Sequence, residues 1–213
     1  MRKFAPPATS AAKAVLCAAL LSSLSGCFPL IAGGVAMGAA ATADRRTLGA
    51  QTEDKSITVK AEVRLGKLGG DNGHINIASF NRKVLITGEV PDRATKEAAE
   101  REVRAIEGVQ TVYNELEVAG PASYTSRSSD ALVTTRVKAS LVEMKTISAA
   151  SFKVVTENGT VYLMGRVTQR EGDVATDVTK SVAGVEKVVK LFEYITEEEL
   201  RAITPQPMQS TQL

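Results

Sequence analysis

The chain has 213 residues and a formal net charge of +2, and hydrophobic residues make up 44% of it. These values are typical of a globular protein with one medium or two small domains, and they exclude a strongly basic nucleic-acid-binding protein. The two cysteines are Cys17 and Cys27. Because both stand near the N-terminus, we expect no disulfide and no thiol chemistry in the rest of the chain.

Residues 1–26 have the layout of a lipoprotein signal peptide. A basic beginning precedes an apolar run over residues 14–21, which is too short to span a bilayer. Leu24-Ser25-Gly26-Cys27 follows and resembles a bacterial lipobox, whose cysteine is acylated, with palmitate among the chains, and becomes the first residue of the mature protein. The alternative is an ordinary signal peptide cut elsewhere. We predict lipidation at Cys27, because several acyl chains together give stable anchoring.

Residues 27–52 are predicted to form a tether rich in glycine and alanine at the membrane surface. A second membrane-spanning helix is the alternative, but the apolar stretch over residues 28–43 is short, and its glycines lower helix propensity. Arg45-Arg46 resembles a twin-arginine export signal. It follows the predicted cleavage site, so we reject that interpretation.

An internal repeat with a period of about 76 residues determines the predicted architecture. It predicts one unit over residues 53–119 and a second over residues 128–196, joined by a linker at residues 120–127. Residues 197–213 are predicted to be a disordered tail, with at most one helical turn at its start. The matching segments are 54–65 with 130–141, 84–90 with 161–167, and 107–112 with 183–188.

Each unit is predicted to be α+β, in the order helix–strand–strand–helix–strand, with two helices on one face of a three-stranded mixed sheet. In the first unit we expect a helix, two strands at 74–80 and 83–90, a helix at 92–107 and a strand at 110–118. The first helix carries the apolar residues Ile57, Ala61, Leu65 and Leu68. The second helix turns Ala94, Ala98, Val103 and Ile106 inward and has Gly108 as its C-cap. In the second unit we expect a helix at 130–145, strands at 151–156 and 160–167, a helix from Thr168 to Gly184 and a strand at 185–195. A type I′ turn at Asn158-Gly159 joins the first two strands. The second helix turns Val174, Val178 and Val182 inward.

This element order is similar to that of the BON domain (bacterial osmotically inducible and nodulation domain), and so are the pairs Gly108-Val109 and Gly184-Val185. A lipobox followed by two such units resembles the DolP/YraP group of outer-membrane lipoproteins. The resemblance implies retention at the periplasmic leaflet of the outer membrane, since Phe28 rather than aspartate follows Cys27. It also implies a role in envelope integrity, enrichment at division sites, and binding of anionic phospholipid such as phosphatidylglycerol through the first helix of the second unit.

The positions of apolar and basic residues around that helix give an argument that does not depend on the resemblance. Val133, Val137, Leu141 and Met144 form one stripe, which we assign to the core. A second apolar stripe lies on nearly the opposite side with basic neighbours, which suits anionic headgroups. The predicted lipid-binding residues are Leu132, Thr135, Arg136, Lys138, Ala139, Val142 and Lys145.

Three observations bear on this prediction. The first unit has Ser56 and Gly66 at the positions of Leu132 and Val142, so the outer stripe is expected in the second unit alone. Glu143 lies near the stripe and opposes an anionic surface, and the resemblance implies an aromatic residue where Leu132 stands. The alternative is that Leu132 and Val142 pack against the linker or the other unit.

Motifs for catalysis, metals and cofactors are missing from the sequence. His74 is the one histidine, residues 69–73 lack the Lys-Ser/Thr of a phosphate-binding loop, and there is no Gly-x-Ser-x-Gly elbow. We therefore expect a non-enzymatic protein without cofactor or metal. The resemblance, together with the outer stripe, implies that it binds anionic phospholipid. The alternative is a protein-interaction adaptor for envelope assembly machinery, the divisome or the regulation of cell-wall hydrolases.

Overall fold

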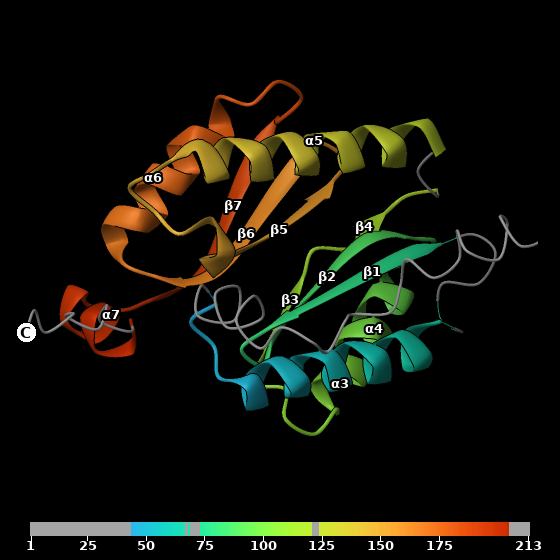
Figure 1. The fold of residues 1–213 in the computed structure, drawn as a ribbon. Coiled ribbons are helices and arrows are strands. Elements are labelled where there is room, and N and C mark those ends of the chain that lie inside the picture. The colour runs from blue at the N-terminus through green and yellow to red at the C-terminus, as the bar shows by residue number, and fades with distance from the viewer. Residues whose placement is uncertain (1–43, 67, 69–72, 121–123, 205–213) are drawn as a thin grey trace, which may run out of the picture. The chain divides into compact units, whose positions relative to one another are not determined.

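The structure is a computed structural model that describes residues 44–66, 68, 73–120 and 124–204 (Figure 1). The predicted signal peptide, Cys27 and residues 28–43 of the tether lie outside these residues. Residues Ala40–Leu213 form one compact unit. None of the helices in the described part of the chain combines the length and the hydrophobicity that a membrane span requires.

Two α+β domains follow one another, as the repeat predicts. The elements of the first are α3 (Leu48–Leu65), β1 (His74–Phe80), β2 (Lys83–Val90), α4 (Arg93–Arg104), β3 (Thr111–Asn114) and β4 (Glu117–Val118). Those of the second are α5 (Tyr124–Glu143), a short 3-10 turn (Ala149–Ser151), β5 (Phe152–Glu157), β6 (Thr160–Val167), α6 (Gln169–Lys180) and β7 (Lys187–Tyr194), followed by α7 (Glu197–Ile203). The α+β class and the element order are thus confirmed.

Both sheets are mixed and are built around their second strand. β1 pairs with β2 antiparallel, and β3 and β4 pair with β2 in parallel. β5, β6 and β7 repeat this arrangement. Asn158 and Gly159 have φ angles of 45° and 70°, as the predicted type I′ turn requires. The third strand of the first domain is interrupted between β3 and β4, where the Leu116 N–H donates a hydrogen bond to Asn114 Oδ1.

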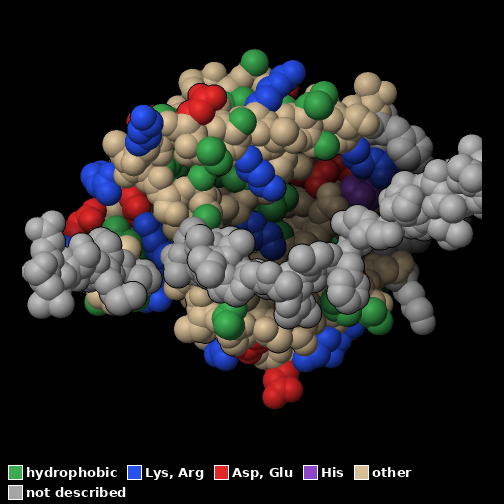
Figure 2. All heavy atoms as spheres, in the orientation of Figure 1, with side chains coloured by type: hydrophobic (Ala, Val, Ile, Leu, Met, Phe, Trp, Pro, Cys, Tyr) green, Lys and Arg blue, Asp and Glu red, His purple; other side chains and the backbone are tan. Residues whose placement is uncertain are grey.

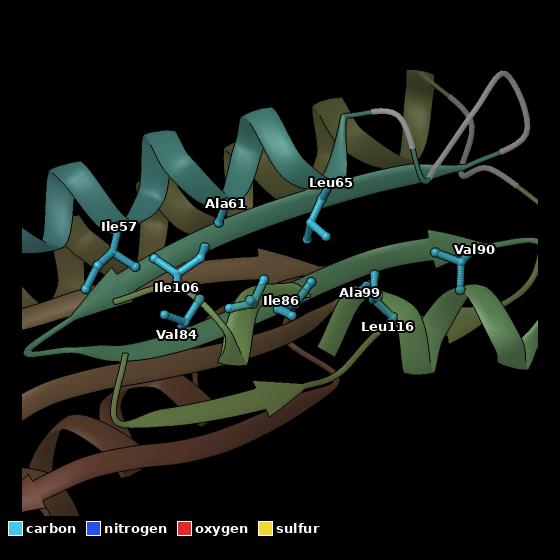
Figure 3. Close-up of a cluster of buried hydrophobic side chains, with 10 residues drawn as sticks. Ile57, Ala61, Leu65, Val84, Ile86, Val90, Ala99, Ile106 and Leu116 are labelled. Atoms are coloured by element: carbon cyan, nitrogen blue, oxygen red, sulfur yellow. The ribbon is translucent and has the colours of Figure 1, made fainter. Parts of the chain in front are cut away.

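Each domain has a core between its helices and one face of its sheet. In the first domain, the buried residues of α3, Ile57, Ala61 and Leu65, pack against Val84 and Ile86 of β2 (Figure 3). In the second, Val133, Val137 and Leu141 of α5 are buried as expected, and Met144 packs at the margin. The inward stripes of the two shorter helices, α4 and α6, were predicted less accurately.

In α4, Ala94 is exposed and Ala98 is half-buried, whereas Ala99 is fully buried together with Val103. In α6, the positions nearest the sheet are the small residues Ala175 and Thr179, and the expected valines lie at the margin of the core. Small residues face the sheet because these helices approach it closely. In α6, periodicity placed valines at the centre of the face, and in α4 it selected Ala94 and Ala98 instead of Ala99.

Gly108 and Gly184 are not helix C-caps, because α4 and α6 end four residues earlier at Arg104 and Lys180. Their φ angles are +91° and +95°. A Cβ on Gly108 would lie 2.6 Å from Glu53 Oε1, and one on Gly184 would lie 2.8 Å from a methyl group of Val133. Each glycine is therefore required where the chain passes closely beneath the first helix of its own domain.

Three helix boundaries differ from the prediction. α3 begins inside the expected tether, where the Thr47 hydroxyl accepts a hydrogen bond from the Ala50 N–H. α5 begins inside the expected linker, because residues 124–129 contain no glycine or proline that would stop it. α7 occupies Glu197–Ile203 behind a Thr196–Glu199 capping box, so the expected disorder is wrong for those residues. Residues 205–213 lie outside the described part.

Each sheet has a face that its own helices do not cover, and these two faces pack against each other. Residues from β1 and β2 meet residues from β6 and β7 in a third hydrophobic cluster, whose buried members are Ala78, Phe80, Leu85, Tyr162, Met164 and Leu191. Leu85 and Tyr162 occupy equivalent positions of the repeat, so each domain uses the same surface. The order is helices, sheet, sheet, helices (Figure 1). This contact explains why β2 and β6 are buried along almost their whole length.

Candidate functional site

The outer face of α5 is the surface that the sequence predicts to bind lipid, and it is exposed. Leu132 is 58% and Val142 is 71% exposed. Thr135, Arg136 and Ala139 are exposed between them, as are Lys138 and Lys145 beside them. Figure 2 shows hydrophobic and basic side chains interspersed over this helix. Leu132 and Val142 therefore do not pack against the first domain, so that part of the alternative interpretation is wrong.

The structure brings most of the predicted residues together and separates one. Lys145 follows the end of α5 at Glu143 and lies in the subsequent turn. Arg136 Nη1 donates a hydrogen bond to the Ala183 carbonyl at 3.3 Å, which holds its guanidinium at the edge of the face. The Thr135 hydroxyl is bonded to the Ala131 carbonyl within the helix, so this residue presents mainly its methyl group.

Helix α3 of the first domain also exposes apolar side chains, contrary to the expectation that only the second unit does so. Val59 is 58% and Val63 is 72% exposed. By the repeat, they correspond to Thr135 and Ala139 of α5 rather than to Leu132. Comparing single aligned positions missed them because the apolar residues shift by about one turn within the same face.

Asp54 and Asp130, equivalent residues of the repeat, each hold the hairpin turn of their own domain. Asp54 is 3% exposed and accepts hydrogen bonds from the backbone N–H groups of Asn81 and Arg82, at 2.7 and 2.8 Å. Asp130 accepts from the N–H groups of Asn158 and Gly159, at 2.9 and 3.0 Å. The carboxylates stabilise turns whose backbone has positive φ angles. The sequence repeat contains both aspartates, but it does not reveal this role.

Asp54 has two further donors, the Ser79 hydroxyl and Arg46 Nη1, both at 2.7 Å. Burial by itself would raise the pKa of Asp54, but the hydrogen bonds from Arg82, Ser79, Asn81 and Arg46 outweigh it and lower that pKa. Arg46 is itself stacked over the Phe80 ring, 4.2 Å from its centroid. Asp54 is thus ionised in the folded protein.

Arg45 joins the first described residues to the second domain. Its guanidinium makes two hydrogen bonds of 2.7 Å to the Glu171 carboxylate and one of 3.0 Å to the Arg166 carbonyl. Burial acts to raise the pKa of Glu171, but hydrogen bonds from Arg45 and the Thr168 N–H lower it overall. The Arg45-Arg46 pair, rejected above as an export signal, therefore has a structural role that the sequence does not indicate.

Polar side chains also bridge the two domains around the shared hydrophobic cluster. Glu157 of β5 accepts hydrogen bonds from Asn76 Nδ2 and the Thr87 hydroxyl, at 2.7 and 3.0 Å. Asn158 Nδ2 donates to Glu89 Oε1 at 2.8 Å. These bonds satisfy carboxylates that the domain contact buries, and they make its geometry specific.

The arrangement offers a binding surface, and we found no candidate catalytic constellation on it. Within residues 44–204 as described, no group of three or more His, Cys, Asp or Glu side chains could hold a metal ion. His74, at the start of β1, lies beside Asn76 and Glu157 in a small surface pocket.

Comparisons with known proteins give consistent results. A family model described as "BON domain" matches residues 53–120 and 129–196. The chain is 37% identical over 174 residues to "Outer membrane lipoprotein DolP" of Haemophilus influenzae, covering 81% of this chain and 90% of that protein. It is 32% identical to the "21 kDa hemolysin" of Actinobacillus pleuropneumoniae, over 71% of this chain and 79% of the relative, and 30% identical to "Osmotically-inducible protein Y" of Escherichia coli, over 64% and 70%.

Proposed function

This chain belongs to the BON-domain family, and from that premise we propose that it is a non-enzymatic outer-membrane lipoprotein that binds anionic phospholipid through α5. In this proposal Cys27 carries the acyl chains that hold the protein on the periplasmic leaflet. The outer face of α5 then selects anionic lipid, such as phosphatidylglycerol, within that leaflet. The relative named as an outer membrane lipoprotein supports the location.

The observation that carries the lipid proposal is the exposure of two large apolar side chains on a helix whose core face is already complete. Leu132 and Val142 are mostly exposed, and Lys138 and Arg136 flank them. Inserting apolar side chains into the headgroup region is favourable, and each cation near an anionic surface adds about 1 kcal/mol. Glu143 reduces this attraction without cancelling it, because the helix face carries more cations than anions.

Co-sedimentation with vesicles of phosphatidylglycerol and phosphatidylcholine tests the proposal. All three hydrophobic clusters lie within residues 57–192, so a fragment of residues 44–213 retains every core and is expected to fold. Replacing Leu132 and Val142 together by glutamate should weaken vesicle binding at least about tenfold, because it removes the inserting groups and adds two repelled charges.

Val118→Glu is the matched control, since Val118 is 53% exposed but belongs to β4 rather than to the outer face of α5. It should leave binding unchanged. Equal binding by the wild type and the Leu132→Glu/Val142→Glu variant would refute the lipid function. Lipid-independent capture of an envelope protein by both would instead support the adaptor alternative.

The proposal extends to the cell. If anionic lipid accumulates at division sites, the α5 face concentrates the protein there, where it supports envelope integrity. A fluorescent fusion of the full chain should then be enriched at the septum. The same fusion with Leu132→Glu and Val142→Glu should remain membrane-bound through Cys27 but spread evenly around the cell.

A further inference from the structure

A groove of about 440 Å³ lies where α3 of the first domain meets the edge of the second domain's sheet. Arg46, Lys55 and Val59 line it from the first domain, and Lys153 of β5 lines it from the second. The second domain therefore contributes one side chain, that of Lys153, to a groove lined mainly by the first domain. Its volume is in the range of sites that hold small molecules or parts of them.

Lys153 is the unusual residue of this groove. Its ammonium donates one hydrogen bond, to the Ser79 carbonyl at 3.0 Å. A lysine ammonium has three N–H donors, and among the described residues no carboxylate forms an ion pair with this one. Burial lowers the pKa of Lys153, and repulsion from Arg46 and Lys138 lowers it further, against a smaller opposite effect of Asp54. A bound anion would relieve both costs.

The acidic residues nearby cannot supply that anion. The Asp54 carboxylate is already bonded to Arg46, Ser79 and the backbone of the hairpin turn, as described above. Glu62 also lines the groove but is exposed to solvent. Lys55, an exposed residue one turn before Val59 on α3, likewise has no ion pair in the part of the chain that the structure describes.

We propose that this groove binds the phosphate of an anionic lipid headgroup, with Lys153 as its central cation and Lys55 as a second. Val59, which is 58% exposed at the groove, would contact the glycerol or the first part of an acyl chain. Lys138, one of the predicted lipid-binding residues of α5, repels the Lys153 ammonium electrostatically. This interaction links the groove to the outer face of α5. This inference rests on the proposed lipid function and extends it, because it makes the first domain part of the lipid site.

Two binding measurements on residues 44–213 test the inference. The first titrates the protein with inorganic phosphate at constant ionic strength and follows the amide signals of Ser79 and Lys153 by NMR. The second repeats the co-sedimentation with phosphatidylglycerol and phosphatidylcholine vesicles. Lys153→Met should weaken both interactions about fivefold or more, the effect of one cation at an anionic surface. Lys153→Arg, which keeps the charge, should retain most of the binding.

Lys180→Met is the matched control, because Lys180 is exposed on α6 and pairs with Asp177; it should change neither affinity more than about twofold. Equal behaviour of the Lys153→Met and Lys180→Met variants, or no saturable response to phosphate, would overturn the inference. Weaker phosphate binding with unchanged vesicle binding would assign the groove to free phosphate and overturn the headgroup role. The Leu132→Glu/Val142→Glu variant should lose vesicles but keep phosphate, which separates failure of this groove from failure of the α5 site.

Discussion

At the residue scale, buried charged side chains hold loops and domains in place. Asp54 and Asp130 stabilise the two hairpin turns, and Arg45 connects to Glu171 across the domain contact. Each carboxylate is buried and accepts several hydrogen bonds. Removing one partner of such a group is costly, because the other is left buried and unpaired.

Asp54 should make folding stability depend on pH in the acid range. Its folded pKa is below the ordinary value of 3.8. Ionised Asp54 therefore stabilises the fold fully above about pH 4, and this contribution is lost as the pH falls through the lower folded pKa. Asp54→Asn should cost about 2–4 kcal/mol at pH 7 and flatten the decline in stability below pH 4. Urea unfolding at several pH values measures both effects.

Asp177→Asn is a suitable comparison, since Asp177 is 78% exposed on α6. We expect it to leave the free energy of unfolding nearly unchanged. If Asp54→Asn were as harmless as Asp177→Asn at pH 7, the carboxylate would not be the group that holds the turn.

At the element scale, the first helix of each domain is positioned by a glycine beneath it. Gly184 has a φ angle of +95°, and a side chain there would meet Val133 of α5. The same relation connects Gly108 with Glu53 and α3. The difference is the neighbour: Glu53 is a long side chain with 31% of its surface exposed, whereas Val133 is buried and β-branched.

Gly184→Ala should therefore destabilise the protein more than Gly108→Ala. Both substitutions strain a left-handed backbone, at about 1–2 kcal/mol. Only the first also displaces a rigid core side chain, which adds about 1–3 kcal/mol. Thermal denaturation of the two variants measures the difference, and equal losses would show that the contact with Val133 is unimportant.

At the scale of the whole molecule, the two domains bury equivalent sheet faces against each other. This contact leaves α5 and α3 on the outside, and it forms the groove that contains Lys153. Because both copies of the repeat use the equivalent sheet face, a single contact buries the apolar surface of both. Of the two proposed lipid-binding surfaces, the groove therefore depends on the domain contact, because that contact brings Lys153 to α3.

Leu85→Glu should separate the domains while preserving each helix–sheet core. Leu85 is 1% exposed in the shared cluster and faces Tyr162 and its neighbours, not α3. A buried glutamate there has no partner, so we expect a loss of about 3–5 kcal/mol in the domain contact. Small-angle X-ray scattering should show a larger radius of gyration, whereas helix content stays constant. Val63→Glu, at a position that is 72% exposed, should change neither quantity.

Local patterns in the sequence were sufficient for the type and order of the elements in each domain, but not for all helix ends. Strand-like runs and the repeat predicted β1, β2 and β6 at the bounds observed, and Asn158-Gly159 predicted its turn. The outer stripe of α5 was also found this way, since Leu132 and Val142 stand opposite a complete core face. These features depend on neighbours within a few residues, and such neighbours are visible along the chain.

Only the tertiary structure decided which surface each domain uses and which polar groups meet. Arg45 and Glu171 are separated by 126 residues, and Lys153 and Ser79 by 74. No local pattern links such pairs, because their contact depends on how two sheets pack. The sequence predicted helices on one face of each sheet and assigned no partner to the other face. The lipobox and the repeat can thus be recognised in the sequence alone, whereas the groove and the salt bridges between the domains require the tertiary packing.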